Sequence, residues 1–379
     1  MGPELPPLSL YVHIPWCVRK CPYCDFNSHA VRDEIPEEHY IRTLIDDLQS
    51  EVAYAQGREI ESIFIGGGTP SLFSGASYQL LLEEINRLIP IKASAEITIE
   101  ANPGTFEQEK FASYKDAGIN RLSIGIQSFN DQHLKELGRI HSGKEAIHAI
   151  SLAREIFPNI NLDLMHGLPG QSLDNALADL DQAISLQPNH LSWYQLTIEP
   201  NTEFHAKPPS LPVDETLWTI QEHGQARIAD AGFSQYEISA YAKEKGKRSR
   251  HNLNYWTFGD YLGIGAGAHG KITLLSEQKV LRRWKQKQPK AYMEPSTRLQ
   301  GCEAIAENEL GFEFMLNVLR LSEGVPCELF TDRTGLALEQ VQSEIAEARR
   351  RKLLVDNAEI IKPTTQGRLF LNDLLGIFL

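Results

Sequence analysis

The chain has 379 residues, 42% of them hydrophobic and 23% charged, which is an ordinary composition for a soluble globular protein. Its 37 basic and 50 acidic residues give a formal net charge of −13. This charge argues against a nucleic-acid backbone as the main partner but leaves docking at a membrane protein open. The first thirty residues contain no basic segment followed by a long apolar run, so we expect neither a secretory signal nor a membrane-spanning helix.

The cysteines point to a ligand set. The chain has five of them, an odd number, and three fall within eight residues. Such crowding is not typical of a disulfide framework, and it fits a reducing cytoplasm. The length of the chain suits one large α/β domain and one smaller domain.

Apolar, β-branched runs alternate with helical patterns along the first part of the chain. Strands are predicted at residues 8–14, 60–65, 96–100, 122–126, 160–165 and 191–198. Helices are predicted at residues 36–56, 173–186 and 214–231, the first ending at Gly57. Repeated β-then-α units indicate a parallel sheet with right-handed crossovers. The predicted fold class is therefore α/β, an incomplete parallel (β/α)6 barrel over residues 1–233.

Chemically distinctive residues follow the predicted strands rather than precede them. At or near the strand ends lie Cys17, Gly67, Glu100, Gln127, Asp163 and Glu199. Parallel barrels build their active sites at this rim. We therefore predict that these separate segments meet at one mouth.

The pattern changes after about residue 233. One further strand is predicted at 236–241, and the glycine-rich stretch 259–270 is expected to be irregular. Residues 234–300 are predicted to link the barrel edge to a smaller, mainly helical, winged-helix-like domain at 301–379. The acidic balance and the lack of a dense Lys/Arg face favour packing or docking by this domain over DNA binding.

Cys17, Cys21 and Cys24 form a C-x3-C-x2-C loop just after the first predicted strand. Thiolates bind soft metals and iron–sulfur clusters, and a cubane cluster has four irons. Three protein ligands leave the fourth iron open to a chelating molecule. The alternative is a structural zinc site, which needs a fourth protein ligand such as His13 or His29.

The stretch from Tyr11 to Phe26, YVHIPWCVRKCPYCDF, resembles the radical SAM superfamily, in particular the branch that holds oxygen-independent coproporphyrinogen oxidases and HemW-type heme chaperones. The resemblance covers nearly the whole chain and implies a [4Fe–4S] cluster on the three cysteines, with S-adenosylmethionine (SAM) on the open iron. The decarboxylases of this branch carry a further cysteine where this chain has Phe26. They also have a longer N-terminal segment, whereas only ten residues precede Tyr11 here. Both departures favour the chaperones.

The same resemblance implies a set of SAM-contacting residues. They are Tyr11, Tyr23, Gly67, Gly68, Thr69, Glu100, Gln127, Arg139 and Asp163. The glycine turn resembles the superfamily's GGE-type motif, which holds the amino group of SAM, and glycines let backbone amides approach a ligand closely.

The side-chain chemistry of Glu100, Gln127, Arg139 and Asp163 indicates part of their roles in binding SAM. Glu100 can accept hydrogen bonds from ribose hydroxyls, although a helix cap or a salt bridge is an equal alternative without context. Gln127 can bond ribose or a carboxylate, and Arg139 can hold a carboxylate with two parallel hydrogen bonds unless it is a surface residue. Asp163 lies inside an apolar strand, where an unpartnered carboxylate is costly, so a ligand role is favoured.

The stretch His251-Asn252-Leu253-Asn254-Tyr255-Trp256 follows a basic segment, and the resemblance links it to heme. His251 is the candidate axial ligand, because histidine commonly ligates heme iron. Tyr255 and Trp256 can pack on the porphyrin, and Arg248 or Arg250 can meet a propionate. The alternative is that His251 is a hydrogen-bonded core residue.

Three further residues complete the candidates. His269 is a second possible heme ligand, although its glycine loop is more readily placed near SAM's adenine. Cys302 and Cys327 are isolated and are expected to be ordinary buried or half-exposed thiols.

The sequence thus predicts a cytoplasmic heme chaperone, or one held peripherally at the membrane, that binds a [4Fe–4S] cluster, SAM and heme. Its predicted partners are a heme donor, a heme-accepting respiratory protein and a reductant protein. One alternative is an oxygen-independent coproporphyrinogen III oxidase, in which SAM yields a radical for decarboxylation. The other is a structural metal protein without SAM chemistry.

Overall fold

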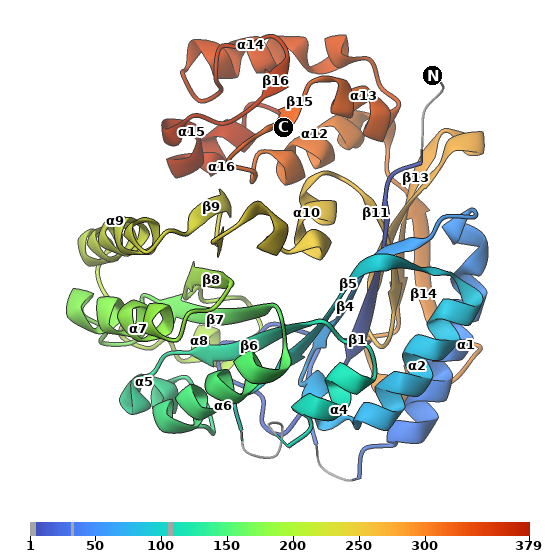
Figure 1. Ribbon diagram of the computed structural model, residues 1–379. Helices are drawn as coiled ribbons and strands as arrows, with labels where there is room; N and C mark the ends of the chain where they lie inside the picture. The colour runs from blue at the N-terminus through green and yellow to red at the C-terminus, as the bar shows by residue number, and fades with distance from the viewer. Residues whose placement is uncertain (1–4, 32–33, 105–108) are drawn as a thin grey trace.

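A sheet of twelve strands is the framework of the computed structural model, which describes residues 5–31, 34–104 and 109–379. Its strand order is β14-β13-β12-β11-β1-β4-β5-β6-β7-β8-β10-β9 (Figure 1). The parallel strands are β1 (Leu8–Ile14), β4 (Ile60–Gly67), β5 (Ile91–Ala101), β6 (Arg121–Gln127), β7 (Ile160–His166), β8 (His190–Gln195) and β11 (Asp260–Ile264). The sheet does not close, so the prediction of an incomplete barrel of parallel β/α units is confirmed.

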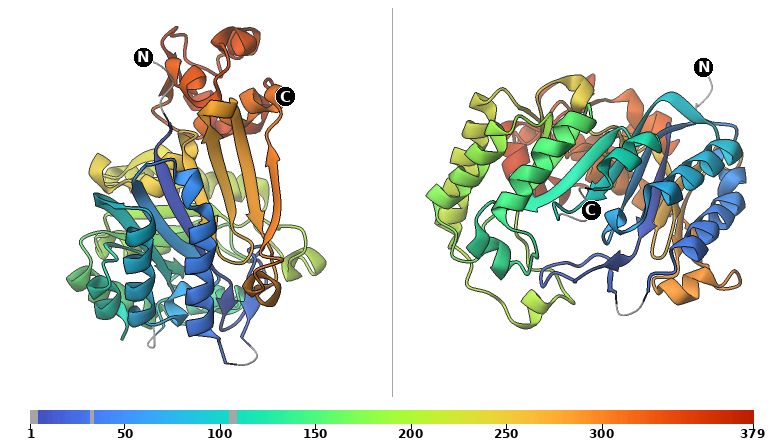
Figure 2. Two further views of the ribbon diagram at one scale, coloured as in Figure 1. Left: turned by 90° about the vertical axis from the view of Figure 1, so that its right-hand side faces the viewer. Right: turned by 60° about the horizontal axis from the view of Figure 1, so that its bottom comes forward.

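Helices between the parallel strands cover the outer side of the curved sheet (right-hand view of Figure 2). They are α1 (Glu37–Ala55), α2 (Gly75–Leu88), α4 (Phe111–Asp116), α5 (Asp131–Glu136), α6 (Gly143–Ile156) and α7 (Leu173–Ser185). After β8 follow α8 (Glu203–Ala206) and α9 (Asp214–Asp230). The predicted stop of the first helix is confirmed, because Gln56 and Gly57 both take left-handed backbone conformations there.

The stretch between β8 and the C-terminal helices differs from its prediction in two places. The single strand expected at 236–241 is two short antiparallel strands, β9 (Ser234–Glu237) and β10 (Ala240–Ala242), because the Glu237 carboxylate accepts a hydrogen bond from Ser239 N and turns the chain. The stretch 259–270 was expected to be irregular, but it contains β11. Glycine suits this strand because a Cβ at Gly263 would lie 2.0 Å from the His269 carbonyl oxygen.

Three antiparallel strands extend the sheet beyond β11 and rise beside α1 (left-hand view of Figure 2). They are β12 (His269–Leu274), β13 (Lys279–Lys285) and β14 (Leu299–Ala304). Sequence periodicity does not predict these strands, because polar and apolar residues alternate too weakly in β13 to indicate a strand.

The C-terminal region has its own hydrophobic core, which includes Phe314 and Phe330. Its elements are α12 (Glu307–Val318), β15 (Val325–Pro326), α13 (Glu328–Thr334), α14 (Gln342–Arg350), β16 (Ile360–Ile361), α15 (Thr365–Leu369) and α16 (Leu371–Leu375). The expectation of a mainly helical end is confirmed, with β15 and β16 as a small antiparallel pair. Phe258 and Val280 join this core from the barrel edge, so the C-terminal region packs on the extended sheet.

A buried ionic cluster fastens the extension to the barrel. Lys285 of β13 donates to Asp47 and Glu51 of α1, each at 2.6 Å, and Arg283 bonds both oxygens of Glu51 at 2.9 and 3.1 Å. Tyr292 adds a hydrogen bond to Asp47 at 2.6 Å. Burial raises the pKa of Asp47, and Lys285 opposes that rise. Burying these charged groups costs desolvation free energy, which their mutual attraction offsets. Removing one member therefore leaves an uncompensated buried charge.

We therefore expect Lys285→Met to lower the free energy of unfolding by about 3–5 kcal/mol, since Asp47 and Glu51 lose a cation while the apolar stem is kept. Urea unfolding followed by circular dichroism measures the change. The matched control is Lys92→Met, which breaks an ion pair with Glu61 in which both side chains are 47% exposed, and it should cost less than about 1 kcal/mol. Equal losses in the two variants would contradict a stabilising role of the buried cluster.

Candidate functional site

A cavity of about 360 Å³ opens at the carboxyl ends of the parallel strands. Of the residues predicted for the cluster and SAM, all but Tyr11 line it: Cys17, Cys21, Tyr23, Cys24, Gly67, Gly68, Thr69, Glu100, Gln127, Arg139 and Asp163. They come from the cysteine loop, from β4, β5, β6 and β7, and from the segment after α5. Parallel strands bring these ends to one edge, which is why residues distant in sequence share one cavity.

The cysteine loop is held at the mouth of this cavity by a pair of short parallel strands. In this pair, β2 (Trp16–Cys17) lies beside β3 (His29–Ala30) and brackets the loop. Cys17 is buried, whereas Cys21 and Cys24 are half-buried and joined by a turn in which Cys24 N donates to the Cys21 carbonyl at 3.1 Å. The Arg139 guanidinium lies 3.8 Å from the Cys21 sulfur, a contact that tunes a ligating thiolate.

The arrangement fits a cluster better than a zinc ion. Among the described residues, no group of three His, Cys, Asp or Glu side chains converges on a single metal ion. A cubane cluster binds each thiolate to a different iron, so its sulfur ligands do not have to converge. His13, one proposed fourth zinc ligand, uses both ring nitrogens already: it donates to the Asn27 carbonyl at 2.8 Å and accepts from Tyr11 at 2.9 Å.

The glycine turn at the end of β4 is shaped by its neighbours on β1 and β2. Gly67 has a φ of 114°, and a Cβ there would lie 2.5 Å from the His13 ring. A Cβ on Gly68 would lie 2.5 Å from the Trp16 carbonyl oxygen. Only glycine satisfies both positions, and its absence of a side chain leaves the turn open to the cavity.

Two carboxylates form one wall of the cavity. Glu100 accepts a hydrogen bond from Gly67 N at 3.1 Å, and Asp163 accepts from Ser123 at 2.9 Å and from Asn161 at 2.8 Å. Neither makes an ion pair within the described part of the chain. Burial, and next the charge of Asp163, raise the pKa of Glu100 to about 8. This wall therefore suits a cationic ligand group.

Arg139 supplies the opposite charge on the other side. Its Nη2 donates to the Asn102 side chain at 2.6 Å and to the Gly125 carbonyl at 2.7 Å. Its Nε is buried without a partner in the described residues. SAM carries a cationic amino group, a sulfonium and a carboxylate. The carboxylate wall and the unsatisfied guanidinium nitrogen fit these groups.

The side chain of Gln127 lines the cavity, and its backbone takes a conformation that is rare for residues other than glycine. It ends β6 in a left-handed conformation with a φ of 66°, beside an irregularity in the pairing with β7. Tyr194 of β8 donates to its side-chain oxygen at 3.1 Å and so fixes the amide. Backbone strain of this kind occurs at functional sites, where it fixes the direction of a side chain.

Sequence reasoning missed several residues that line the cavity. They are Asn102, Ser123, Ser192, Tyr194, Glu237 and Asn252. Tyr194 was overlooked because the last parallel strand was expected to run to residue 198, whereas β8 ends at Gln195. The predicted rim residue Glu199 therefore lies outside the cavity lining, where it bonds Thr197. With the strand end placed at Gln195, the rule that functional residues lie at the carboxyl ends of parallel strands would have indicated Tyr194.

Tyr11 does not reach the cavity. It pairs with Phe64 in the sheet register, three residues before Gly67, and its ring stacks on that phenylalanine. Its hydroxyl bonds His13, the residue packed under the glycine turn. Tyr11 thus supports the floor of the site from a deeper layer.

His251 is also away from the cavity, on α10 (Arg250–Trp256). It is 1% exposed, and its nitrogens bond Ser62 at 3.2 Å and Tyr255 at 3.0 Å. Burial lowers its pKa to about 3. This geometry matches the alternative of a hydrogen-bonded core histidine, and neither nitrogen is open to iron in this arrangement. The heme role of His251 stays a prediction.

The other heme candidates have similar structural roles. Arg248 forms a two-pronged ion pair with Glu323, and Arg250 donates to the Ser94 carbonyl. His269 is exposed at the start of β12, and the glycine loop before it packs on His13 and Asn27 rather than lining the cavity. Cys302 is exposed on β14, and Cys327 is buried.

Comparison with known proteins decides the family. Residues 11–183 match the Radical SAM superfamily, and residues 305–370 match the HemN C-terminal domain. The heme chaperone HemW of Escherichia coli strain K12 is 52% identical over 377 residues, which cover 99% of each chain. The chain belongs to the HemW family. The HemW of Haemophilus influenzae is 53% identical over 100% of this chain, and that of Bacillus subtilis is 35% identical over 98%.

A solved structure confirms the fold of this HemW-family chain. Coproporphyrinogen III oxidase (HemN) from Escherichia coli, described as a radical SAM enzyme, superposes with a TM-score of 0.82 at 23% sequence identity. The match covers 100% of this chain and 91% of that one. The predicted resemblance to the radical SAM superfamily and to HemW is therefore confirmed, and the likeness to HemN shows a shared fold.

Glu100 gives a test of the cavity's electrostatics. Because its folded pKa is raised to about 8, its contribution to stability is fully present near pH 4.5 and is lost as the pH rises toward 8. We expect Glu100→Gln, which stays neutral, to melt several degrees above the unmodified apo protein at pH 8 and at the same temperature near pH 5. Differential scanning calorimetry across this range measures the gap, with Glu199→Gln outside the cavity as control. A difference in melting temperature that does not widen as the pH rises would contradict a buried Glu100 carboxyl with a raised pKa.

Proposed function

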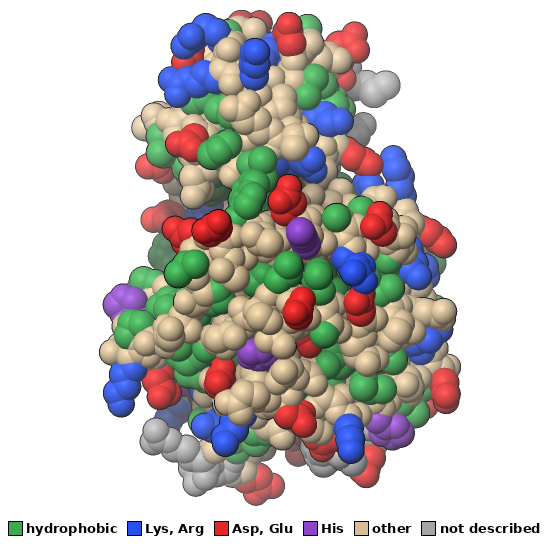
Figure 3. Space-filling view, turned by 90° about the vertical axis from the view of Figure 1, so that its left-hand side faces the viewer, with side chains coloured by type: hydrophobic (Ala, Val, Ile, Leu, Met, Phe, Trp, Pro, Cys, Tyr) green, Lys and Arg blue, Asp and Glu red, His purple; other side chains and the backbone are tan. Residues whose placement is uncertain are grey.

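We propose that this chain is a heme chaperone that carries a [4Fe–4S] cluster and SAM in the cavity and delivers heme to an acceptor. The observation that carries the proposal is identity above half, over essentially the full chain, with two proteins named heme chaperone HemW. The cavity supports it independently, because the residues expected around a cluster and SAM meet there. Exposed charges of both signs occur across the face of the molecule in Figure 3.

In this proposal Cys17, Cys21 and Cys24 hold three irons. The cluster, when bound, supplies one electron at a time to SAM. Arg139 holds the carboxylate of SAM through its unsatisfied nitrogen, and the wall of Glu100 and Asp163 takes the cationic groups. Gln127, fixed by Tyr194, and the backbone of the glycine turn position the rest. Tyr23, Thr69 and Asn102 also line the cavity.

Phe26 supports the chaperone over the decarboxylase. It lines the cavity mouth and is 60% exposed, at the position where a decarboxylase of this branch carries a further cysteine. The loop of this chain therefore offers three thiolates and an apolar surface.

The proposal also covers the partners of the protein and its cellular location. We propose a heme donor, a respiratory acceptor at the membrane, a reductant protein, and a cytoplasmic or peripheral location. The described helices include none with the length and apolar composition needed to span a bilayer. We also propose the division into a barrel (1–233), a linking segment (234–300) and a C-terminal domain (301–379), supported by the separate C-terminal core.

The cluster is tested by its metal content. We expect the anaerobically reconstituted protein to hold about four irons and four acid-labile sulfides per chain. Cys24→Ser should lose most of both and the EPR signal of the reduced cluster, since one iron loses its thiolate. Cys302→Ser, on exposed β14, is the matched control and should keep them. Zinc without acid-labile sulfide in the unmodified protein would refute the cluster.

The chaperone is tested against the decarboxylase in one incubation. We expect the reconstituted, reduced protein to bind hemin with a shifted Soret band and to form no protoporphyrinogen from coproporphyrinogen III in the presence of SAM. Assaying 5′-deoxyadenosine in the same samples reports whether SAM is cleaved. Robust turnover of coproporphyrinogen would overturn the chaperone assignment.

A further inference from the structure

The edge strand β9 is bound by the loop between α12 and β15 of the C-terminal domain. In this loop, Ser322 N donates a backbone hydrogen bond to the Tyr236 carbonyl oxygen at 3.0 Å, and Arg320 Nη2 lies 3.6 Å from Glu237 Oε2. The Arg320 guanidinium carbon also lies 4.2 Å from the ring centroid of Trp256, at the end of α10. The loop therefore fastens both β9 and α10 to the C-terminal domain.

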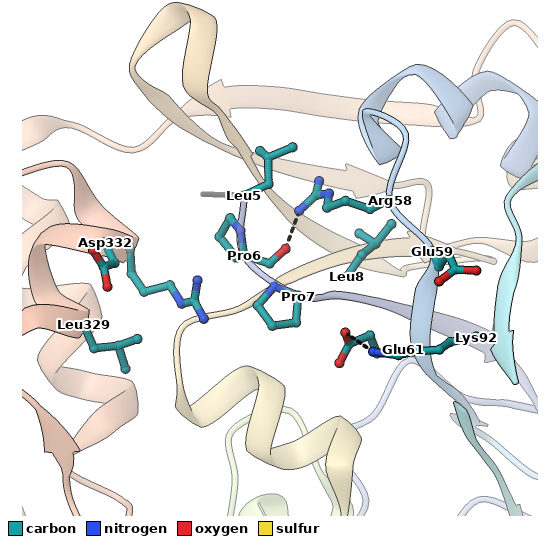
Figure 4. A pocket seen from close by; sticks show the side chains of 11 residues that line it. Leu5, Pro6, Pro7, Leu8, Arg58, Glu59, Glu61, Lys92, Leu329 and Asp332 are labelled. Atoms are coloured by element: carbon teal, nitrogen blue, oxygen red, sulfur yellow. Dashed lines mark hydrogen bonds and ion pairs between the residues drawn. The ribbon is translucent and has the colours of Figure 1, made fainter. Parts of the chain in front are cut away.

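On the side of α13, the contact between the C-terminal domain and the barrel is interrupted by a cavity of about 580 Å³. Figure 4 shows Leu329 and Asp332 of α13 across from the N-terminal prolines and Arg58. No residue of its described lining belongs to the lining of the cavity at the carboxyl ends of the strands, which we call the SAM cavity. A direct route from the C-terminal domain to the SAM cavity runs instead through the loop at β9.

Glu237 of β9 lies on the same level of the sheet as Asp163. The register pairs Asp163 with Ser192, Ser192 with Ala240, and Ala240 with Glu237. Residues opposite each other on neighbouring strands point to the same face of a sheet, and all four line the SAM cavity. Ser192 and Ala240 are small, so they take up little of the space between the two carboxylates. Glu237 therefore extends the wall of Glu100 and Asp163 around the barrel.

The Glu237 carboxylate has one oxygen to spare. Its side chain is buried, Oε1 accepts a hydrogen bond from Ser239 N at 3.1 Å, and Oε2 has no hydrogen-bond partner among the described residues. Burial raises the pKa of Glu237, and the charge of Arg320 is the strongest effect that opposes this rise. Two neighbours, Tyr236 and Tyr241, stay neutral because burial raises their pKa values as well. A buried, unpartnered carboxylate oxygen beside a cavity suits a cationic ligand.

We propose that Glu237 is a third carboxylate that attracts SAM into the cavity, and that Arg320 of the C-terminal domain is its positioning residue. The proposal rests on the SAM binding proposed above and adds a role for the C-terminal domain in it. SAM has one positive charge in excess, because it carries a sulfonium, an amino group and a single carboxylate. Arg320 lies outside the cavity lining with its side chain 30% exposed, so solvent screens its charge more than that of the buried Glu237.

The test separates charge from shape by comparing SAM with S-adenosylhomocysteine, which lacks the methyl group and the sulfonium charge. Affinities are measured by isothermal titration calorimetry with the full-length reconstituted protein at neutral pH. Glu237→Gln should weaken SAM about 3- to 10-fold and S-adenosylhomocysteine less than about 2-fold, as expected for one charge acting across a partly screened distance. Glu323→Gln is the matched control. It breaks the ion pair with Arg248 in the same loop but outside the SAM cavity, and it should leave both affinities unchanged.

Arg320→Gln tests whether the domain contact sets the charge of Glu237. Without the cation, burial keeps the Glu237 carboxyl protonated to higher pH, so this variant should resemble Glu237→Gln at mildly acidic pH. Its SAM affinity should recover at alkaline pH as Glu237 ionises, beyond the pH dependence that Glu100 gives to both proteins. Arg320→Lys keeps a positive charge and should restore the affinity at neutral pH. Adding Arg320→Gln to Glu237→Gln should weaken SAM no further, at any pH.

Two results would overturn the proposal while the unmodified protein still binds SAM. Equal weakening of SAM and S-adenosylhomocysteine by Glu237→Gln would mean that this side chain shapes the cavity without contributing its charge. An Arg320→Gln variant that melts at a lower temperature but keeps the SAM affinity and pH profile of the unmodified protein would mean that Arg320 only fastens the domain. If the unmodified reconstituted protein binds no SAM, the SAM site proposed above fails, and the role of Glu237 fails with it.

Discussion

The parallel register of β1, β4, β5, β6, β7 and β8 is the constraint on which the site depends. Because all these strands point the same way, each delivers the residues after it to one edge. The cysteine loop, the glycine turn, Glu100 and Gln127 meet there although they are spread over more than a hundred residues. An antiparallel pairing anywhere in this row would send its neighbour's residues to the far edge.

Although the chain as a whole is acidic, its buried cations have specific local partners. Lys285 is a buried cation that lies between two buried carboxylates, Asp47 and Glu51. Arg139 differs, since its guanidinium group lacks a carboxylate partner among the described residues. In a low-dielectric interior such a group is costly, and a ligand anion removes the cost. Arg139 lies at the cavity to which we assign SAM.

A chain of hydrogen bonds links the cavity to β9. Asn161 donates to Asp163, which lines the cavity, at 2.8 Å and accepts from His190 at 2.6 Å. His190 accepts in turn from Tyr236 of β9 at 2.8 Å. Burial keeps His190 neutral by lowering its pKa. A neutral His190 fixes the order of donors and acceptors along this chain.

The sequence by itself determined the parallel core, the helical end, the family and the motif residues of the cavity, because local periodicity and motif spacing carry that information. It predicted that Cys17, Gly67 and Arg139 share one site, and the structure brings all three to one cavity. Tertiary structure decided the rest. The pairing of β11 with β1, and the contacts of β13 with α1 through Lys285 and Arg283, join residues more than two hundred positions apart. Tyr194 and Asn252 reach the cavity only through the fold, and His251 is buried because α10 lies over Ser62 and Phe64.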